Sequence, residues 1–181
     1  MSKDNKVLCN VDKRYIRLND KIGSETTADI INALFEMEES KHKDDIDFYI
    51  NCRGGSAYDF FAIYDVIQSM ESKVNTIGLG QNMSGGCFLL MAGTGERKIY
   101  PNTRVMLHGL QCGFPWQSHE DQKQWYKEHE EIQQMVTNIT VKHTGKKREK
   151  VEEDIKRDRF MSAKEALEYG MVDEIIGGKN E

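Results

Sequence analysis

The chain has 181 residues, enough for one domain that buries a full core without disulfide or metal staples. Its residues are 38% hydrophobic and 30% charged, a balance that indicates neither a disordered chain nor a membrane protein. A net charge of −5, with Lys and Arg interspersed among acids, gives no basic footprint for nucleic acid. We therefore expect one globular domain over residues 1–181, with neither a nucleic-acid nor a membrane partner.

The four cysteines form no C-x-x-C pair, so neither a zinc site nor a thioredoxin-type motif is predicted; they are Cys9, Cys52, Cys87 and Cys112. Reduced thiols in a cytoplasmic protein are the simpler interpretation. The first ten residues are charged and lack the apolar stretch of a signal peptide. The sequence thus predicts a cytoplasmic protein that uses no metal and no other cofactor.

Strands and helices alternate in the first half of the chain. Residues 14–19 alternate in the manner of a strand, and Ser24 is expected to cap the helix that follows. Two strand–glycine turn–helix units come next, over 46–70 and 74–93, and Ser56 is expected to cap the helix of the first unit. This alternation predicts an α/β fold built on crossover connections.

The second half begins with a strand that ends at His108, and residues 109–118 follow as an irregular or hairpin segment. A long helix is predicted over 119–142, and Gly145 is placed to end it. The apolar stripe of this helix consists of Trp125, Ile132, Met135, Val136 and Ile139. After a short charged helix, the string SAKE at 162–165 is a capping box that starts one more helix.

Ser84 is the first candidate for chemistry, in the string GQNMSGGCFLL between a predicted strand and an apolar helix. Free backbone N–H groups at a helix start can stabilise an oxyanion, so Ser84 is a candidate nucleophile. Asn82 stands where the nucleophile elbow of α/β-hydrolases has glycine, so that motif is absent. A helix cap or a small packing residue is the alternative interpretation of Ser84.

A nucleophilic serine needs a base, and His108 is the candidate because it follows an apolar strand. A hydrogen-bonded core histidine is the alternative interpretation of His108. The other four histidines are expected to face solvent; they are His42, His119, His129 and His143. A third triad member would be a carboxylate, and spacing alone selects none of the 30 acidic residues.

Four strings together resemble the proteolytic subunit of the Clp protease, the ClpP family, from about Arg14 to Ile176. They are YINCRGGSAYDFFAIYDVIQ, GQNMSGGCFLLMAGTGER, PNTRVMLH and RDRFMSAKEALEYGMVDEII. The resemblance implies a ClpP/crotonase-like α/β fold with repeated β-β-α type units. It also implies a handle region at about 109–142, built on the long helix, and a short N-terminal segment over 1–13.

The resemblance further implies the roles of five residues. Ser84 would be the nucleophile, His108 the base, and Asp158 of the string RDRF the residue that orients the base. The backbone N–H groups of Gly55 and Gly85 would form the oxyanion hole, and a glycine turn can bring such donors close. The implied activity is that of an ATP-dependent-type serine endopeptidase, which hydrolyses peptide bonds by acyl transfer without a metal or cofactor.

The resemblance also implies partners. Family members form seven-membered rings stacked in pairs, so a tetradecameric homo-oligomer that encloses its active sites is expected. Unfolded polypeptides and peptides are the implied substrates, and a hexameric AAA+ ATPase is the implied partner. The alternatives are a structural or regulatory subunit with little proteolysis in a mixed ring, a stand-alone peptidase, and an acyl-CoA hydratase of crotonase type.

The chain departs from the family pattern in two regions near the expected site. Gly85 occupies the position where methionine usually follows the serine, which we expect to loosen the turn. Gly109 and Leu110 follow His108 where the family usually has Gln-Pro, and the segment behind them differs as well. The sequence therefore leaves the cleavage preference open.

A third departure concerns the surface on which Clp ATPases dock. Three positions that are usually aromatic in the family fall on Asp47, Ser69 and Lys98, whereas Tyr49 is retained. A charge in such a pocket disfavours burial of an apolar docking loop, because a desolvated and unpaired charge is costly. The sequence predicts that this protein does not engage a standard Clp ATPase.

Overall fold

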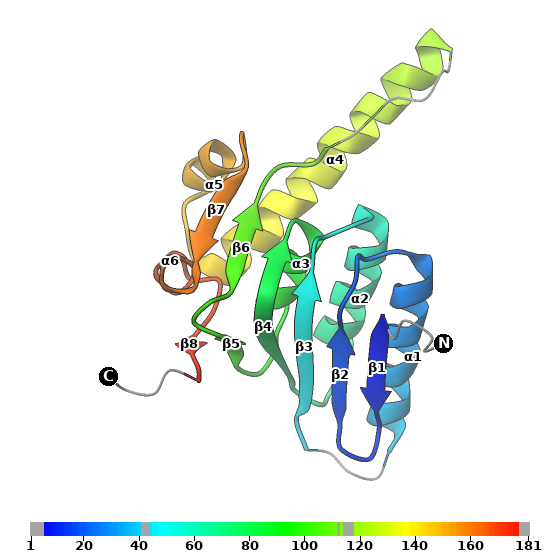
Figure 1. Cartoon of the computed structure of the whole chain (residues 1–181). Coiled ribbons are helices and arrows are strands. Elements are labelled where there is room, and N and C mark those ends of the chain that lie inside the picture. The colour runs from blue at the N-terminus through cyan, green and yellow to red at the C-terminus, as the bar shows by residue number, and fades with distance from the viewer. Residues whose placement is uncertain (1–5, 41–43, 112, 114–117, 178–181) are drawn as a thin grey trace, which may run out of the picture.

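In the computed structural model, which describes residues 6–40, 44–111, 113 and 118–177, one mixed sheet carries helices on one of its faces (Figure 1). The strands are β1 (Val7–Asn10), β2 (Tyr15–Leu18), β3 (Ile46–Cys52), β4 (Val74–Met83), β5 (Arg97–Ile99), β6 (Arg104–Leu107), β7 (Arg159–Ser162) and β8 (Glu174–Ile175). The helices are α1 (Ser24–Glu39), α2 (Ala57–Ser69), α3 (Gly85–Met91), α4 (His119–Thr144), α5 (Arg148–Asp154) and α6 (Ala163–Tyr169).

The sheet forks at β4, and this fork positions the candidate site. The strands run in the order β1-β2-β3-β4-β5-β8, while β6 also pairs with β4 and β7 pairs with β6. β4 pairs with β5 through Thr76–Gly78 and with β6 through Gln81–Met83, and both pairings are parallel. Gly80 lies between the two segments at a φ of 61°, a conformation that glycine adopts without strain. The ends of β4 and β6 therefore lie side by side, and Ser84 and His108 follow them directly.

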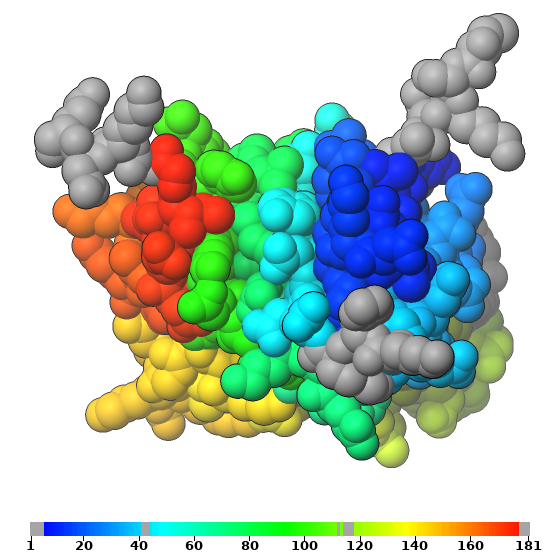
Figure 2. Space-filling view, turned by 90° about the horizontal axis from the view of Figure 1, so that it is seen from below, coloured from blue at the N-terminus to red at the C-terminus, as the bar shows by residue number. Residues whose placement is uncertain are grey.

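Alternation along β3 explains why one face of the sheet is covered. Phe48 and Ile50 are fully buried on the face that packs against the helices, whereas Asp47 and Tyr49 on the other face are partly exposed. Helices α1, α2 and α3 lie on the buried side, and α4 projects beyond the sheet (Figure 1). At the opposite end, β8 near the C-terminus pairs with β5, so the red and green segments meet in Figure 2.

Most of the predicted elements are confirmed. The two units expected over 46–70 and 74–93 are β3–α2 and β4–α3, and the Ser56 hydroxyl accepts the N–H of Asp59 as the expected cap of α2. Gly145 ends α4 in the left-handed conformation at a φ of 66°. The capping box at the start of α6 is present, because Ser162 and Glu165 exchange hydrogen bonds.

Three predictions about individual residues are wrong. Ser24 is the first residue of α1 rather than its cap; Gly23 precedes the helix, and its N–H donates to Thr26 Oγ1 over 3.0 Å. In the stripe of α4, Ile132, Val136 and Ile139 are buried, but Trp125 and Met135 remain 39% and 47% exposed. The short strands β1 and β8 were not expected from the sequence, because so few residues show no clear alternation.

His143 is the third incorrect prediction, since it does not face solvent freely. Its Nε2 lies 2.8 Å from the hydroxyl oxygen of Tyr64, and the ring is partly buried at the end of α4. Burial, together with the positive charges of Lys142 and Arg97, lowers the pKa of His143 to about 4. The imidazole is therefore neutral at pH 7 and serves as a packing and hydrogen-bonding group. His42 and much of segment 112–117 lie outside the described residues.

Candidate active site

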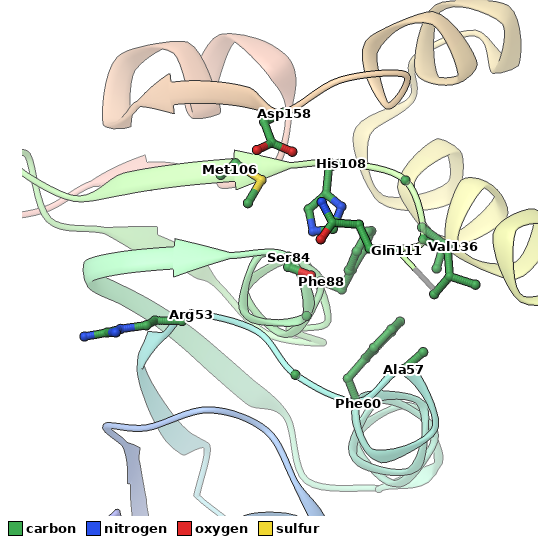
Figure 3. A pocket seen from close by; sticks show the side chains of 14 residues that line it. Arg53, Ala57, Phe60, Ser84, Phe88, Met106, His108, Gln111, Val136 and Asp158 are labelled. Carbon is green, nitrogen blue, oxygen red and sulfur yellow. The ribbon is translucent and has the colours of Figure 1, made fainter. Parts of the chain in front are cut away.

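All five residues singled out from the sequence line a single cavity of about 420 Å³ (Figure 3). They come from three separate parts of the chain: the glycine turn before α2, the ends of β4 and β6, and the turn before β7. The cavity is lined by Arg53, Gly55, Ala57, Phe60, Ser84, Gly85, Phe88, Met106, His108, Gly109, Leu110, Gln111, Val136 and Asp158. The fold thus gathers a hydroxyl, an imidazole and a carboxylate at one place.

Ser84 stands at the junction of β4 and α3 in an unusual backbone conformation. Its φ is 53° and its ψ is −123°, values that cost a non-glycine residue about 1–3 kcal/mol. The backbone is held there because Ser84 N–H donates to Met106 over 2.9 Å, while its carbonyl accepts from Cys87 and Phe88. The side chain makes no capping hydrogen bond to α3. The alternative interpretation of Ser84 as a helix cap is therefore wrong, and its hydroxyl is available in the cavity.

His108 follows β6 and lies beside Ser84, because Met83 and Met106 are paired in the parallel β4–β6 ladder (Figure 3). Its Nδ1 is buried and has no hydrogen-bond partner in the structure. A buried polar atom without a partner costs about 1–3 kcal/mol, so such atoms are rare unless they serve a function. For Nδ1, the alternative interpretation of a hydrogen-bonded core histidine is wrong.

Asp158 lies opposite His108 on the neighbouring strand connection. β6 and β7 pair in antiparallel fashion, with Leu107 opposite Arg159, so the next residues outward are His108 and Asp158. Figure 3 shows Ser84, His108 and Asp158 in that order across the mouth of the cavity, although no hydrogen bond yet joins them. Asp158 is exposed and has no ion-pair partner among the described residues. Its carboxylate is free to approach the imidazole.

Asp154 is the other acid nearby, and it is already committed. Its side chain is 4% exposed and accepts hydrogen bonds from Lys150, Arg159 and Tyr169 over 2.6, 2.7 and 2.9 Å. Burial raises the pKa of this carboxyl, but the hydrogen bonds and the positive charges outweigh burial and hold the pKa below its usual value. This contrast separates a structural aspartate from a candidate catalytic one, which spacing in the sequence could not do.

The turn at Gly54 and Gly55 packs directly against Ser84. A Cβ atom at Gly54 would lie 2.6 Å from the Cβ of Ser84, and one at Gly55 would lie 1.9 Å from the carbonyl oxygen of Ile22. Both glycines have positive φ values, 102° and 152°, so their positions require glycine.

Two backbone N–H groups are placed to meet an oxyanion beside Ser84. Ile22 N–H donates to the Gly54 carbonyl and Ser56 N–H to the Ile22 carbonyl, so the N–H of Gly55 is not used in this pairing. Gly85 is the first residue of α3, and its N–H has no acceptor within the helix. A Cβ atom on Gly85 would lie 3.5 Å from the nitrogen of Gly55, which shows how close the two segments approach.

One end of the cavity is apolar. Phe60 and Phe88 are stacked with ring centroids 5.2 Å apart, and they line this end with Ala57 and Val136 (Figure 3). Such a surface accepts an apolar side chain and excludes water from it. Among the described residues, no group of three His, Cys, Asp or Glu side chains is arranged to hold a metal ion, and no helix has the length and apolar character to cross a bilayer.

Comparison with known proteins places the chain in a family. The sequence model of the family described as Clp protease matches residues 3–179. The chain belongs to the Clp protease family. The resemblance inferred from the four strings and the α/β fold expected from it are confirmed.

Two relatives of this Clp protease chain cover most of its length. It is 37% identical over 164 residues to an ATP-dependent Clp protease proteolytic subunit of Deinococcus radiodurans, with 90% of this chain and 80% of that protein covered. It is 37% identical over the same length to the chloroplastic ATP-dependent Clp protease proteolytic subunit 6 of Arabidopsis thaliana. In that case the chain spans 60% of the relative's length, so about three-fifths of that protein has a counterpart here.

In this member of the Clp protease family, Gln133 holds the segment that follows His108. The N–H of Leu110 donates to Gln133 Oε1 over 2.6 Å, and the N–H of Gly109 donates to the carbonyl of Ile155 over 2.9 Å. A Cβ atom at Gly109 would lie 2.8 Å from Gln133 Oε1, so glycine makes room for this side chain. The sequence analysis missed Gln133, and its signal was the Gly-Leu pair where the family usually has Gln-Pro, since proline has no N–H to donate.

Replacing Gln133 by methionine should lower kcat/KM for peptide hydrolysis about tenfold, mainly through KM, because the cavity-lining segment loses a hydrogen bond. Gln133→Glu keeps an acceptor oxygen and should restore most of the loss. Leu110→Pro removes the donor of the same bond, so combining it with Gln133→Met should add little further loss. Steady-state kinetics on a fluorogenic peptide would measure this, and additive losses would contradict the assignment.

Proposed function

We propose that this chain is a serine endopeptidase subunit in which Ser84, His108 and Asp158 form a catalytic triad. The observation that carries the proposal is the convergence of the three side chains on one cavity, with Ser84 held at a positive φ and the Nδ1 of His108 buried without a partner. Family membership supports a peptidase rather than an acyl-CoA hydratase of crotonase type, a reaction that does not require this set of side chains.

The mechanism is acyl transfer. Ser84 Oγ attacks the carbonyl carbon of the scissile peptide bond while His108 accepts the hydroxyl proton. The N–H groups of Gly55 and Gly85 receive the resulting oxyanion, and Asp158 orients the imidazole and stabilises the imidazolium. His108 then donates the proton to the leaving amine as the C–N bond breaks. Water, deprotonated by His108, attacks the acyl-enzyme and restores Ser84.

The proposed assembly is a pair of stacked seven-membered rings in which the region at about 109–142 is the handle. Support comes from α4, which projects beyond the sheet and exposes Trp125, Tyr126 and Met135. Large exposed apolar side chains on a projecting helix mark an association surface. Self-assembly would enclose the cavities, so the substrates would be peptides and unfolded polypeptides.

We further propose that a standard Clp ATPase does not dock on the open face of the sheet. Tyr49 lines an apolar hollow there with Tyr15, Leu79 and Tyr100, but charged residues border it. Lys98 lies in the same cross-strand row as Tyr49 and forms an ion pair with Glu96, and Asp47 accepts a hydrogen bond from Asn75. This arrangement favours a stand-alone peptidase or a different partner. Stimulation of protein degradation by a housekeeping Clp ATPase, abolished when this surface is blocked, would contradict the proposal.

A serine-directed probe combined with size determination tests the proposed function. A fluorophosphonate should label the assembled protein, and Ser84→Ala or His108→Ala should abolish labelling, whereas Ser69→Ala, an exposed serine on α2, should not. Assembled rings that resist the probe would instead indicate the structural or regulatory subunit of a mixed ring. The cytoplasmic location expected from the sequence stays a prediction, and the Arabidopsis relative is named as chloroplastic.

A further inference from the structure

Arg53 is an exposed arginine at the mouth of the cavity, directly before the Gly54–Gly55 turn. Among the described residues that line the cavity, it is the one Lys or Arg side chain. It makes no hydrogen bond or ion pair to any described residue, whereas Arg97 and Arg159 are each bound to an aspartate. In a chain with a net charge of −5, an arginine left without an acidic partner at this place calls for an external one.

The cavity has two ends of different chemistry. Figure 3 shows Arg53 on the side of Ser84 opposite to Ala57, Phe60 and Val136. The candidate nucleophile therefore lies between an apolar surface and a guanidinium group. A peptide that crosses the cavity in an extended conformation would place different side chains against the two ends, since residues in such a chain advance about 3.3 Å each.

The direction of the peptide follows from the apolar end. The side chain on the acyl side of the scissile bond gains most from the surface formed by Phe60, Phe88 and Val136. The segment after His108 runs toward α4 on this same side, and it can contact the residues that precede the scissile bond (Figure 3). The leaving-group portion of the peptide must then pass on the side of Arg53.

We propose that Arg53 binds a carboxylate on the leaving-group side of the scissile bond, within about two residues of it. This rests on the proposed peptidase function and adds a substrate class to it. The guanidinium group fits a carboxylate because its N–H donors form two parallel hydrogen bonds to the two oxygens. The carboxylate can belong to an Asp or Glu side chain, or to the C-terminus of a short peptide.

The experiment compares kcat/KM for internally quenched peptides that share a leucine before the scissile bond and an amidated C-terminus. One peptide has Glu and the other Gln at the first or second position after the bond. We expect the Glu peptide to be preferred about fivefold, because an exposed ion pair contributes modestly. A third pair, short peptides with a free or amidated C-terminus, distinguishes the terminal carboxylate from a side chain.

Variants assign the preference to Arg53. Arg53→Gln should abolish it, Arg53→Lys should keep part of it, and Arg53→Glu should favour a Lys peptide instead. Arg17→Gln, at an exposed arginine outside this cavity, is the matched control and should keep the full preference. In wild type, salt at about 0.5 M should shrink the preference, because exposed charges are screened.

The outcomes separate this proposal from the proposed function. Fluorophosphonate labelling of Ser84 should be unchanged in all Arg53 variants, because the probe carries no group on the leaving side that reaches Arg53. Normal labelling with equal rates for Glu and Gln peptides, or a preference that survives in Arg53→Gln, would overturn the role of Arg53 alone. Absence of labelling and of peptide cleavage in wild type would overturn the peptidase function, and the role of Arg53 with it.

Discussion

Replacing Asp158 by asparagine should lower kcat for peptide hydrolysis about 10⁴-fold, with little change in thermal stability. Asparagine keeps the size of the side chain but cannot stabilise the imidazolium of His108, and it favours the wrong tautomer of the ring. Stability should be unaffected because Asp158 is exposed and has no ion-pair partner among the described residues. The measurement is single-turnover peptide cleavage together with a thermal melt of the same preparation.

Asp154→Asn is the matched control, four residues earlier in the chain. Asp154 is buried against Lys150, Arg159 and Tyr169, so losing its charge leaves buried donors without a compensating anion. We expect a loss of about 3 kcal/mol and a Tm lower by about 10 °C, with kcat within about tenfold of wild type well below Tm. Equal kinetic effects of the two substitutions would remove Asp158 from the proposed triad.

The contrast between these aspartates shows what the sequence could and could not predict. Periodicity alone located the strand and helix that flank Ser84 and the strand that ends at His108, because long alternating segments are strong signals. It could not choose an acid, since the choice depends on the antiparallel pairing of β6 with β7, a contact between distant segments. The family motif named Asp158, and the burial of Asp154 explains why that neighbour is unsuited to the role.

Other features of the site lie beyond local patterns for a similar reason. The role of Gln133 depends on α4 packing beside the segment after His108, which brings together residues 23 positions apart. The fork of β4 between β5 and β6 is a property of the whole sheet, and a ten-residue strand gives no sign of it. His143 was expected in solvent because its sequence neighbours are polar, yet Tyr64 from α2 covers it. Tertiary contacts decide each of these cases.

Replacing Gly55 by alanine should abolish peptide hydrolysis and destabilise the fold at the same time. The new Cβ atom would lie 1.9 Å from the carbonyl oxygen of Ile22, and this neighbour is backbone that cannot rotate away. Gly55 also has a φ of 152°, a conformation that alanine rarely adopts. We expect a loss of about 3 kcal/mol in the free energy of unfolding, because the turn and the segment at Ile22 must separate.

The catalytic loss should exceed what partial unfolding explains. Moving the turn displaces the N–H of Gly55, and loss of one oxyanion donor lowers kcat about 10²- to 10³-fold. Measured well below Tm, Gly55→Ala should therefore show this kinetic loss while most of the protein is folded. Gly23→Ala is the control, because a Cβ atom there meets nothing within 4 Å, and it should cost about 1 kcal/mol with kcat unchanged. A folded Gly55→Ala enzyme with normal kcat would show that the oxyanion is stabilised without this turn.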